Sequence, residues 1–299
     1  MRSSDMVELV VLAAIWGASF LFMRVAAPAF GPLALIFVRV GVATLCLLPV
    51  LFWRGEGAGL LTHWRGLAVV GLLNSALPFC LFAWAALSLS AGFTAVLNAT
   101  TPLWGAVVAF AWLGMVLPRL RVAGLVIGFV GVLVLVWGKI SFKPGGDGLA
   151  VLAALAAPVS YGIAANYTKQ KLTAASPLLV ATGSQLTASL MLLPLASFAW
   201  PQTTVPAQAW QAALALAVVC TAVAYLMFFR LIAHIGPSKA ISVTFLIPLF
   251  AVVWGGIFLG ERLTPSMVLG GLVILLGTAL STGLWQPRRA PSQQSGAAG

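Results

Sequence analysis

The residues able to do acid–base or metal chemistry are few, and they flank apolar stretches instead of lying within them. The 299-residue sequence has five acids and two histidines, all at expected helix ends or in loops: Asp5, Glu8, Glu56, Asp147, Glu261, His63 and His234. Cys46, Cys80 and Cys220 lie inside apolar stretches without a CxxC pair, as small core residues do. We therefore predict no catalytic residue, no metal site and no cofactor. The phosphate loop GxxxxGK[ST] is also absent from the sequence.

A second group of residues could bind a solute by hydrogen bonding and ring stacking. These are polar or aromatic side chains within apolar stretches, where ordinary packing against lipid or protein is the alternative for each one. The candidates for a substrate cavity are Trp16, Asn74, Phe79, Asn98, Thr101, Tyr161, Gln185, Tyr225 and Thr244. In the opening stretch IWGASFLFMR, Trp16 is the favoured contact, and Arg24 is read as a charged anchor at a helix end.

Composition places these residues in a lipid bilayer. Hydrophobic residues make up 62% of the chain and charged residues 7%, whereas about a quarter of residues are charged in soluble domains. The apolar runs are long enough for helices that span a bilayer of about 30 Å and too unbroken for barrel strands. Ten helices are expected at 7–28, 33–53, 65–87, 92–114, 121–138, 148–169, 177–199, 208–230, 237–259 and 265–285.

The basic residues indicate how the chain is oriented. With the N-terminus inside, eleven Lys or Arg residues fall on the inner side and five on the outer side. This bias predicts a multi-pass protein of a bacterial-type inner membrane with both termini in the cytoplasm. The net charge of +11 is scattered through loops, so we expect no nucleic-acid partner.

The chain is an internal duplication. At an offset of 146, Pro102 matches Pro248 and Gly114 matches Gly260, and at 145 Pro32 matches Pro177. Five helices per repeat is an odd number, so the second repeat must be inverted relative to the first. The predicted fold is an all-α membrane protein of two inverted five-helix repeats, residues 1–143 and 144–286, with a disordered cytoplasmic tail at 287–299.

Three phrases carry a family resemblance: IWGASFLFMRVA with GPLALIFVRVGVA, SAGFTAVLNATTPLWGAVVAF, and IPLFAVVWGGIFLGERLTPSMVLGGLVILLG. They resemble the drug/metabolite transporter superfamily, EamA type, over nearly the whole chain. The first repeat departs from the family pattern at Met115, where a glutamate would stand. The resemblance implies ten helices and export of small metabolites, and it is greatest to bacterial aromatic amino-acid exporters.

Several residues are assigned to movement or structure. Pro102, Gly105 and Pro248 are candidate hinges, with static kinks between packed helices as the alternative. Arg39 and Glu261 are predicted to form a structural ion pair, with Arg39 facing the substrate path as the second interpretation. At the offset of 145, the repeat partner of Arg39 is Ser184.

Glycines recur on the fifth helix at 124, 128 and 131 and on the tenth at 270, 271 and 277. Small residues allow helices to approach closely. The first interpretation is contact between these two helices within one chain, and the second is a homodimer. We expect a monomer, with the lipid bilayer and a small-molecule substrate as its partners.

The leading hypothesis is a secondary transporter that exports small metabolites, aromatic or hydrophobic amino acids above all, by alternating access without ATP. The sequence has no acid near the middle of a span, so a solute gradient and not a proton is expected to drive transport. A lipid flippase or channel on the same fold is the alternative. An intramembrane enzyme is disfavoured because no base or metal ligand lies at membrane depth.

Overall fold

The computed structural model describes residues 2–137 and 146–282, and every regular element in these ranges is helical. The elements are α1 (Ser3–Phe30), α2 (Pro32–Trp53), α3 (Gly59–Thr62), α4 (Trp64–Gly71), η1 (Leu72–Ala76), α5 (Leu77–Ala85), α6 (Ala91–Asn98), α7 (Thr101–Leu113), α8 (Arg119–Val136), α9 (Gly148–Lys171), α10 (Pro177–Phe198), α11 (Ala207–Ala217), η2 (Val218–Val223), α12 (Ala224–Ile235), α13 (Pro237–Ala240), α14 (Val243–Leu259) and α15 (Pro265–Thr282). The predicted repeat boundary at 143/144 and the predicted tail at 287–299 lie outside the described residues.

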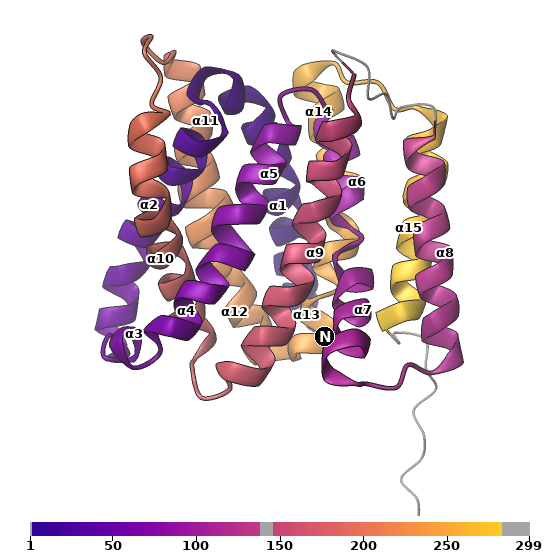
Figure 1. Ribbon diagram of the computed structural model, residues 1–299, viewed down its shortest axis with the longest axis horizontal. Helices are drawn as coiled ribbons and strands as arrows, with labels where there is room; N and C mark the ends of the chain where they lie inside the picture. Colours follow the sequence, from indigo (N-terminus) through magenta and orange to yellow (C-terminus); the bar gives the residue numbers. More distant parts are fainter. Residues whose placement is uncertain (1, 138–145, 283–299) are drawn as a thin grey trace, which may run out of the picture.

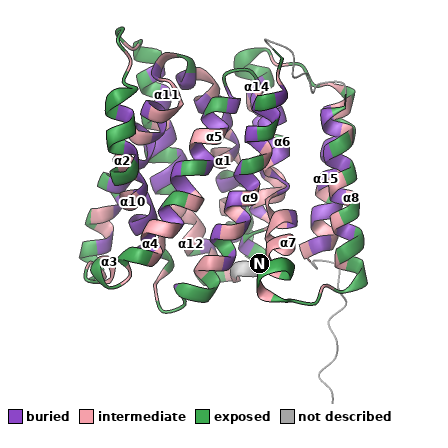
Figure 2. Ribbon diagram, in the orientation of Figure 1, coloured by how far each residue is buried: buried purple, intermediate pink, exposed green. Residues whose placement is uncertain are grey.

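Within the described ranges the elements combine into nine candidate membrane-spanning segments and one shorter apolar helix, against the ten spans predicted. Nine are at least 18 residues long and apolar enough to cross a bilayer, and Val243–Leu259 is a tenth, apolar segment of 17 residues. Between 33% and 56% of each long span is buried in protein. Figure 2 shows that the buried residues face the inside of the bundle and that exposed residues cover the outer helices. The exposed side chains are largely apolar, as expected for a surface solvated by lipid.

The two repeats run in opposite directions. α1 begins at the end of the bundle where Figure 1 marks the N-terminus, whereas α9, the first helix of the second repeat, begins at the other end. We call the first of these the basic end, because Arg54, Arg65, Lys169 and Lys171 lie on the loops and helix ends there. The duplication extends to the backbone. Gly114 and Gly260 are both left-handed C-caps, with φ of 62° and 63°, a conformation that glycine adopts without a Cβ penalty.

Two of the predicted spans are interrupted by residues that are not helical. The fourth span was expected to be continuous over 92–114, but it is broken between Asn98 and Thr101, because Pro102 has no N–H to continue the helix. The ninth span is divided into α13 and α14 by a turn after Ala240. Its Pro248 lies inside the continuous helix α14, so the two repeat-related prolines have different local structures.

α8 and α15 lie side by side at one edge of the bundle (Figure 1) and pack through their glycines. A Cβ on Gly124 would lie 2.5 Å from the backbone nitrogen of Ser281, and a Cβ on Gly131 would lie 2.6 Å from that of Ile274. The backbones are therefore in direct contact. This confirms the interpretation that the glycine rows join the fifth and tenth helices within one chain.

Candidate functional site

Arg39 is a buried cation inside the bundle. It is the eighth residue of α2, about 10 Å from the start of that helix, and only 5% of its surface is exposed. Its Nε donates a hydrogen bond of 3.0 Å to Thr221 Oγ1, and its guanidinium carbon lies 3.6 Å from the ring centroid of Phe79. The ion pairs between described residues are Glu8–Arg230 and Asp5–His234, so Arg39 has no carboxylate partner there.

Four of the predicted cavity residues gather around this arginine. The Phe79 and Tyr161 rings pack edge to face with centroids 6.4 Å apart. Asn74 Nδ2 lies 3.5 Å from the Tyr225 hydroxyl, and both tyrosines lie near Arg39. With Thr221, these residues form what we call the Arg39 cluster: Arg39, Asn74, Phe79, Tyr161, Thr221 and Tyr225.

Two π-helical segments position the cluster. η1 and η2 interrupt the third and eighth spans, and their first residues, Leu72 and Val218, are 146 positions apart, so they are equivalent in the repeat. In η2, Thr221 Oγ1 donates to the Leu216 carbonyl at 2.8 Å, and beside η1, Ser160 Oγ of α9 donates to the Leu73 carbonyl at 2.7 Å. These hydroxyls satisfy carbonyls where the helical ladder is disturbed. π-Helical turns frequently mark functional sites.

Gln185 on α10 makes a hydrogen bond that is equivalent, in the repeat, to the hydrogen bond from Arg39 to Thr221. Its Nε2 donates to Ser75 Oγ at 2.9 Å, and the residue is fully buried. Ser75 and Thr221 are 146 positions apart, as are Arg39 and Gln185. By hydrogen bonding, the counterpart of Arg39 is thus Gln185, one position beyond the Ser184 of the sequence alignment.

A cleft of about 260 Å³ leads from the Arg39 cluster toward the basic end. Asn74 and Tyr225 line its inner part, and Leu172 and Ala175, at the junction of α9 and α10, line its other part. Its lining residues are Asn74, Thr168, Leu172, Ala175, Pro177, Val180, Ala181, Ser184, Tyr225 and Phe229. Of the nine predicted cavity residues, Asn74 and Tyr225 line this cleft.

Aromatic rings also contact one another toward the opposite end of the bundle. The Phe30 ring lies 4.8 Å from that of Trp210 and 6.3 Å from that of Trp200, measured between centroids, and both contacts are edge to face. Phe20 and Phe82 form a further edge-to-face pair at 5.7 Å. These pairs join α1 to α5 and to the start of α11.

The other predicted cavity residues lie outside the contacts of the Arg39 cluster. Trp16 packs on Phe228 of α12 with ring centroids 5.2 Å apart. At the break between α6 and α7, Thr101 Oγ1 donates to the Asn98 carbonyl at 2.7 Å. Thr244 Oγ1 donates to the Ile241 carbonyl at 2.8 Å, at the start of α14. Their predicted contact with substrate stays a prediction.

The hinge candidates are held in different ways. Pro102 follows a real break in the fourth span, and the carbonyl of Gly105 accepts a hydrogen bond of 3.0 Å from Asn166 Nδ2 of α9. A Cβ on Gly162 would lie 2.9 Å from the Gly105 nitrogen, so α7 and α9 are closely apposed there. Movement at Pro102, Gly105 or Pro248 stays a prediction.

The predicted ion pair between Arg39 and Glu261 is wrong. Arg39 turns inward to Thr221, whereas the Glu261 carboxylate accepts hydrogen bonds from the backbone nitrogens of Ala91 at 2.9 Å and Gly92 at 3.4 Å. These nitrogens are the free donors at the start of α6, and a helix N-terminus favours a negative charge. The acid is thus satisfied by a helix end and leaves the buried cation unpaired.

Arg24 completes this arrangement on the other side of the same loop. It lies six residues before the end of α1, farther from the helix end than predicted, and its Nη1 donates to the carbonyls of Ala86 and Leu87 at 2.6 and 2.8 Å. A cation at the end of α5 and an anion at the start of α6 both have the sign that the helix dipoles favour. The two side chains therefore fix the connection between the third and fourth spans.

Replacing Glu261 with glutamine should lower the free energy of unfolding by about 1–2 kcal/mol, because charge-assisted hydrogen bonds become neutral and one carboxylate acceptor is lost. Thermal unfolding of the purified protein in detergent measures the change. The exposed neighbour Arg262 provides the control. An equal loss in Arg262→Gln would show that the bonds to α6 are not the cause.

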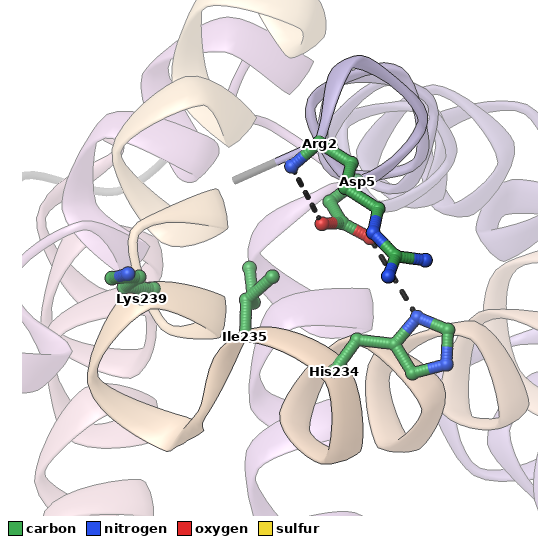
Figure 3. A pocket seen from close by; sticks show the side chains of 5 residues that line it. All are labelled: Arg2, Asp5, His234, Ile235 and Lys239. Carbon is green, nitrogen blue, oxygen red and sulfur yellow. Dashed lines mark hydrogen bonds and ion pairs between the residues drawn. The ribbon is translucent and has the colours of Figure 1, made fainter.

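At the basic end, α1 is tied to α12 by polar contacts. Figure 3 shows Asp5 between the Arg2 backbone nitrogen, at 3.0 Å, and His234 Nδ1, at 3.6 Å. Lys239 and Ile235 line the same pocket of about 600 Å³. This pocket is lined mainly by charged residues near helix ends, whereas the cleft at the Arg39 cluster is lined mainly by residues within the spans.

The chemistry available to the Arg39 cluster is anion binding. An arginine that is buried without a carboxylate can still offer its planar fork of N–H donors to a carboxylate that arrives as a ligand. The surrounding rings of Phe79, Tyr161 and Tyr225 offer apolar faces, and Asn74 and the tyrosine hydroxyls offer further hydrogen bonds. The cluster is thus suited to a small solute with a carboxylate and an apolar or aromatic part.

Comparison with known proteins agrees with the fold and with membrane transport. The chain matches the EamA-like transporter family over residues 6–137 and 148–283, one match for each repeat. This protein belongs to the EamA-like transporter family, and hence to the drug/metabolite transporter superfamily, and it is a membrane transporter.

Its relatives include the uncharacterized transporter YvbV of Bacillus subtilis, 30% identical over 91% of this chain and 89% of that protein. A probable terminal-alkyne amino-acid exporter of Streptantibioticus cattleyicolor is 24% identical over 94% of each chain. A solved crystal structure of 17% identity superimposes with a TM-score of 0.67 over 97% of this chain and 100% of the other. At that identity the structural likeness supports the fold alone.

Proposed function

We propose that this transporter exports small amphipathic metabolites, principally aromatic or hydrophobic amino acids, by alternating access without ATP. The observation that carries the proposal is the buried Arg39, which has no acidic partner among the described residues and is flanked by the rings of Phe79, Tyr161 and Tyr225. An amino acid supplies both a carboxylate for the cation and a side chain for the rings. The likeness to a probable amino-acid exporter supports the same substrate class.

The cleft supports alternating access. It connects the Arg39 cluster with the basic end, while aromatic rings pack together toward the other end. We propose that the basic end lies in the cytoplasm of a bacterial-type cell, with both chain termini there, and that this conformation receives solute from the cytoplasm. Release then requires the second repeat and the first to rock about the Arg39 cluster.

Counterflow in proteoliposomes tests the proposal. Vesicles loaded with unlabelled phenylalanine should accumulate labelled phenylalanine, and labelled sugars should not enter. Failure of every amino acid in the panel to exchange would contradict the proposal, and movement of labelled lipid between leaflets would favour the flippase alternative.

A second expected result concerns the driving force. Arg39 and Asp5 are the charged residues classed as buried in the described chain, and Asp5 lies in the first turn of α1. With no acid beside Arg39 to carry a proton, counterflow should proceed at equal rates with and without an imposed pH gradient. A strict requirement for the gradient in the same vesicles would overturn the gradient-driven mechanism.

A further inference from the structure

Gln185, which is bonded to the residue that follows Asn74 of the Arg39 cluster, has a side-chain oxygen without a hydrogen bond. Gln185 is fully buried, and its Nε2 donates to Ser75, but its Oε1 has no partner. A buried polar atom without a partner is destabilising, and such atoms are uncommon in native proteins. An unpaired acceptor next to a binding site is a natural place for a donor that arrives with the ligand.

The position of Gln185 relates it to Arg39. α2 and α10 pack along each other, and a Cβ on Gly41 of α2 would lie 3.4 Å from Ser189 Oγ of α10. Arg39 reaches from α2 to η2, and Gln185 reaches from α10 to η1, so each side chain joins its own repeat to the π segment of the other. At equivalent positions, the first repeat therefore has the cation of Arg39 and the second repeat has the neutral amide of Gln185.

The two halves are connected through neighbouring residues. Ser75 is the hydrogen-bond partner of Gln185. The residue before it in η1 is Asn74, which contacts Tyr225. Tyr225 in turn lies near Arg39. Asn74, Tyr225 and Ser184, the residue before Gln185, all line the cleft.

From this geometry we infer that Gln185 is a specificity-determining residue whose Oε1 accepts a hydrogen bond from the amino group of the solute, while Arg39 binds the carboxylate. The inference rests on the proposed function and sharpens it. The site selects zwitterionic amino acids over carboxylic acids of the same shape that have no amino group. A neutral amide oxygen suits this role, because a second charge would leave Arg39 with a permanent partner and close the site to a carboxylate.

The test compares two solutes that differ in the amino group, L-phenylalanine and 3-phenylpropionate. Initial rates and KM for both are measured in proteoliposomes containing the wild-type protein. We expect a preference for phenylalanine of about tenfold or more, the effect of one hydrogen bond to a charged group. Equal transport of the two acids by the wild-type protein would overturn the inference, and transport of neither would overturn the proposed function as well.

Three variants separate recognition from structure. Gln185→Met removes the acceptor at similar volume and should lower phenylalanine transport to the level of 3-phenylpropionate while the rate for 3-phenylpropionate stays within about twofold. Gln185→Glu introduces a charge that could pair with Arg39, so it should lower transport of both acids. Ser75→Ala removes the bond to Nε2 but leaves Oε1, so it should retain the preference too. Equal losses for both solutes in Gln185→Met, or loss of the preference in Ser75→Ala, would show that Gln185 is structural only.

Discussion

Replacing Arg39 with alanine is expected to abolish transport of phenylalanine without lowering the yield of folded protein. Truncating one partner of a buried, hydrogen-bonded charge pair costs about 2–5 kcal/mol, or roughly 30-fold or more in affinity. Folding should be spared because the substitution strands no acid among the described residues. Thr221, which loses the Arg39 bond, keeps its own hydrogen bond to the Leu216 carbonyl.

Counterflow and the monodisperse fraction after size exclusion measure the two parts of this prediction. Arg39→Lys is the matched control, since it keeps the charge but not the fork of donors, and it should retain a reduced activity. Normal transport by Arg39→Ala would contradict the role of this residue. A loss of both folded protein and activity would instead assign Arg39 to structure.

The second large effect is expected at the contact between α8 and α15. A methyl group on Gly277 would overlap the backbone nitrogen and Cα of Gly128 and would lie 2.6 Å from the Gly124 carbonyl oxygen. Backbone atoms of a packed helix cannot rotate away, so Gly277→Ala should force the helices apart and destabilise the protein by about 3 kcal/mol. Thermal unfolding in detergent, followed by circular dichroism, measures the loss.

Gly271 on the same helix is the control. A Cβ there would lie 3.6 Å from Val96 Cγ1, which is an ordinary contact. Gly271→Ala should therefore be neutral or stabilising by up to about 1 kcal/mol, the intrinsic preference of a helix for alanine over glycine. Equal unfolding temperatures for the two variants would contradict the close contact of α8 and α15.

The architecture was largely predictable from the sequence. Apolar length identifies membrane spans because the bilayer imposes one dominant constraint, and the positions of Pro and Gly reveal the duplication. The shared left-handed caps at Gly114 and Gly260 show that these matched glycines have matched conformations. The packing of the glycine rows was predictable for the same reason, since small residues at helical spacing have few other uses.

The details of the site were less predictable, because hydrogen bonding between distant spans decided them. The π segments have no local sequence signal, although an offset of 146 already pairs the hydroxyl residues Ser75 and Thr221. Asn74, Phe79, Tyr161 and Tyr225 were identified as polar or aromatic residues in apolar spans, and they do gather around Arg39.

The ion pair was mispredicted because similar depth was taken as evidence of contact. Glu261 found its partners at the N-terminus of α6, and only the fold brings that helix end to it. Backbone N–H groups at a helix end attract an anion, but no charged residue in the sequence marks them. Pairing acids with basic residues therefore leaves these donors out. With Glu261 bound at the start of α6, Arg39 has no acidic partner among the described residues, and this state underlies the functional proposal.

The central claim, that the site binds a carboxylate through Arg39, is tested most directly by competition in wild-type proteoliposomes. Labelled phenylalanine counterflow is measured against unlabelled phenylalanine and against 2-phenylethylamine, which lacks only the carboxylate. The account predicts strong inhibition by phenylalanine and little inhibition by the amine at the same concentration. Equal inhibition by the two compounds would contradict it.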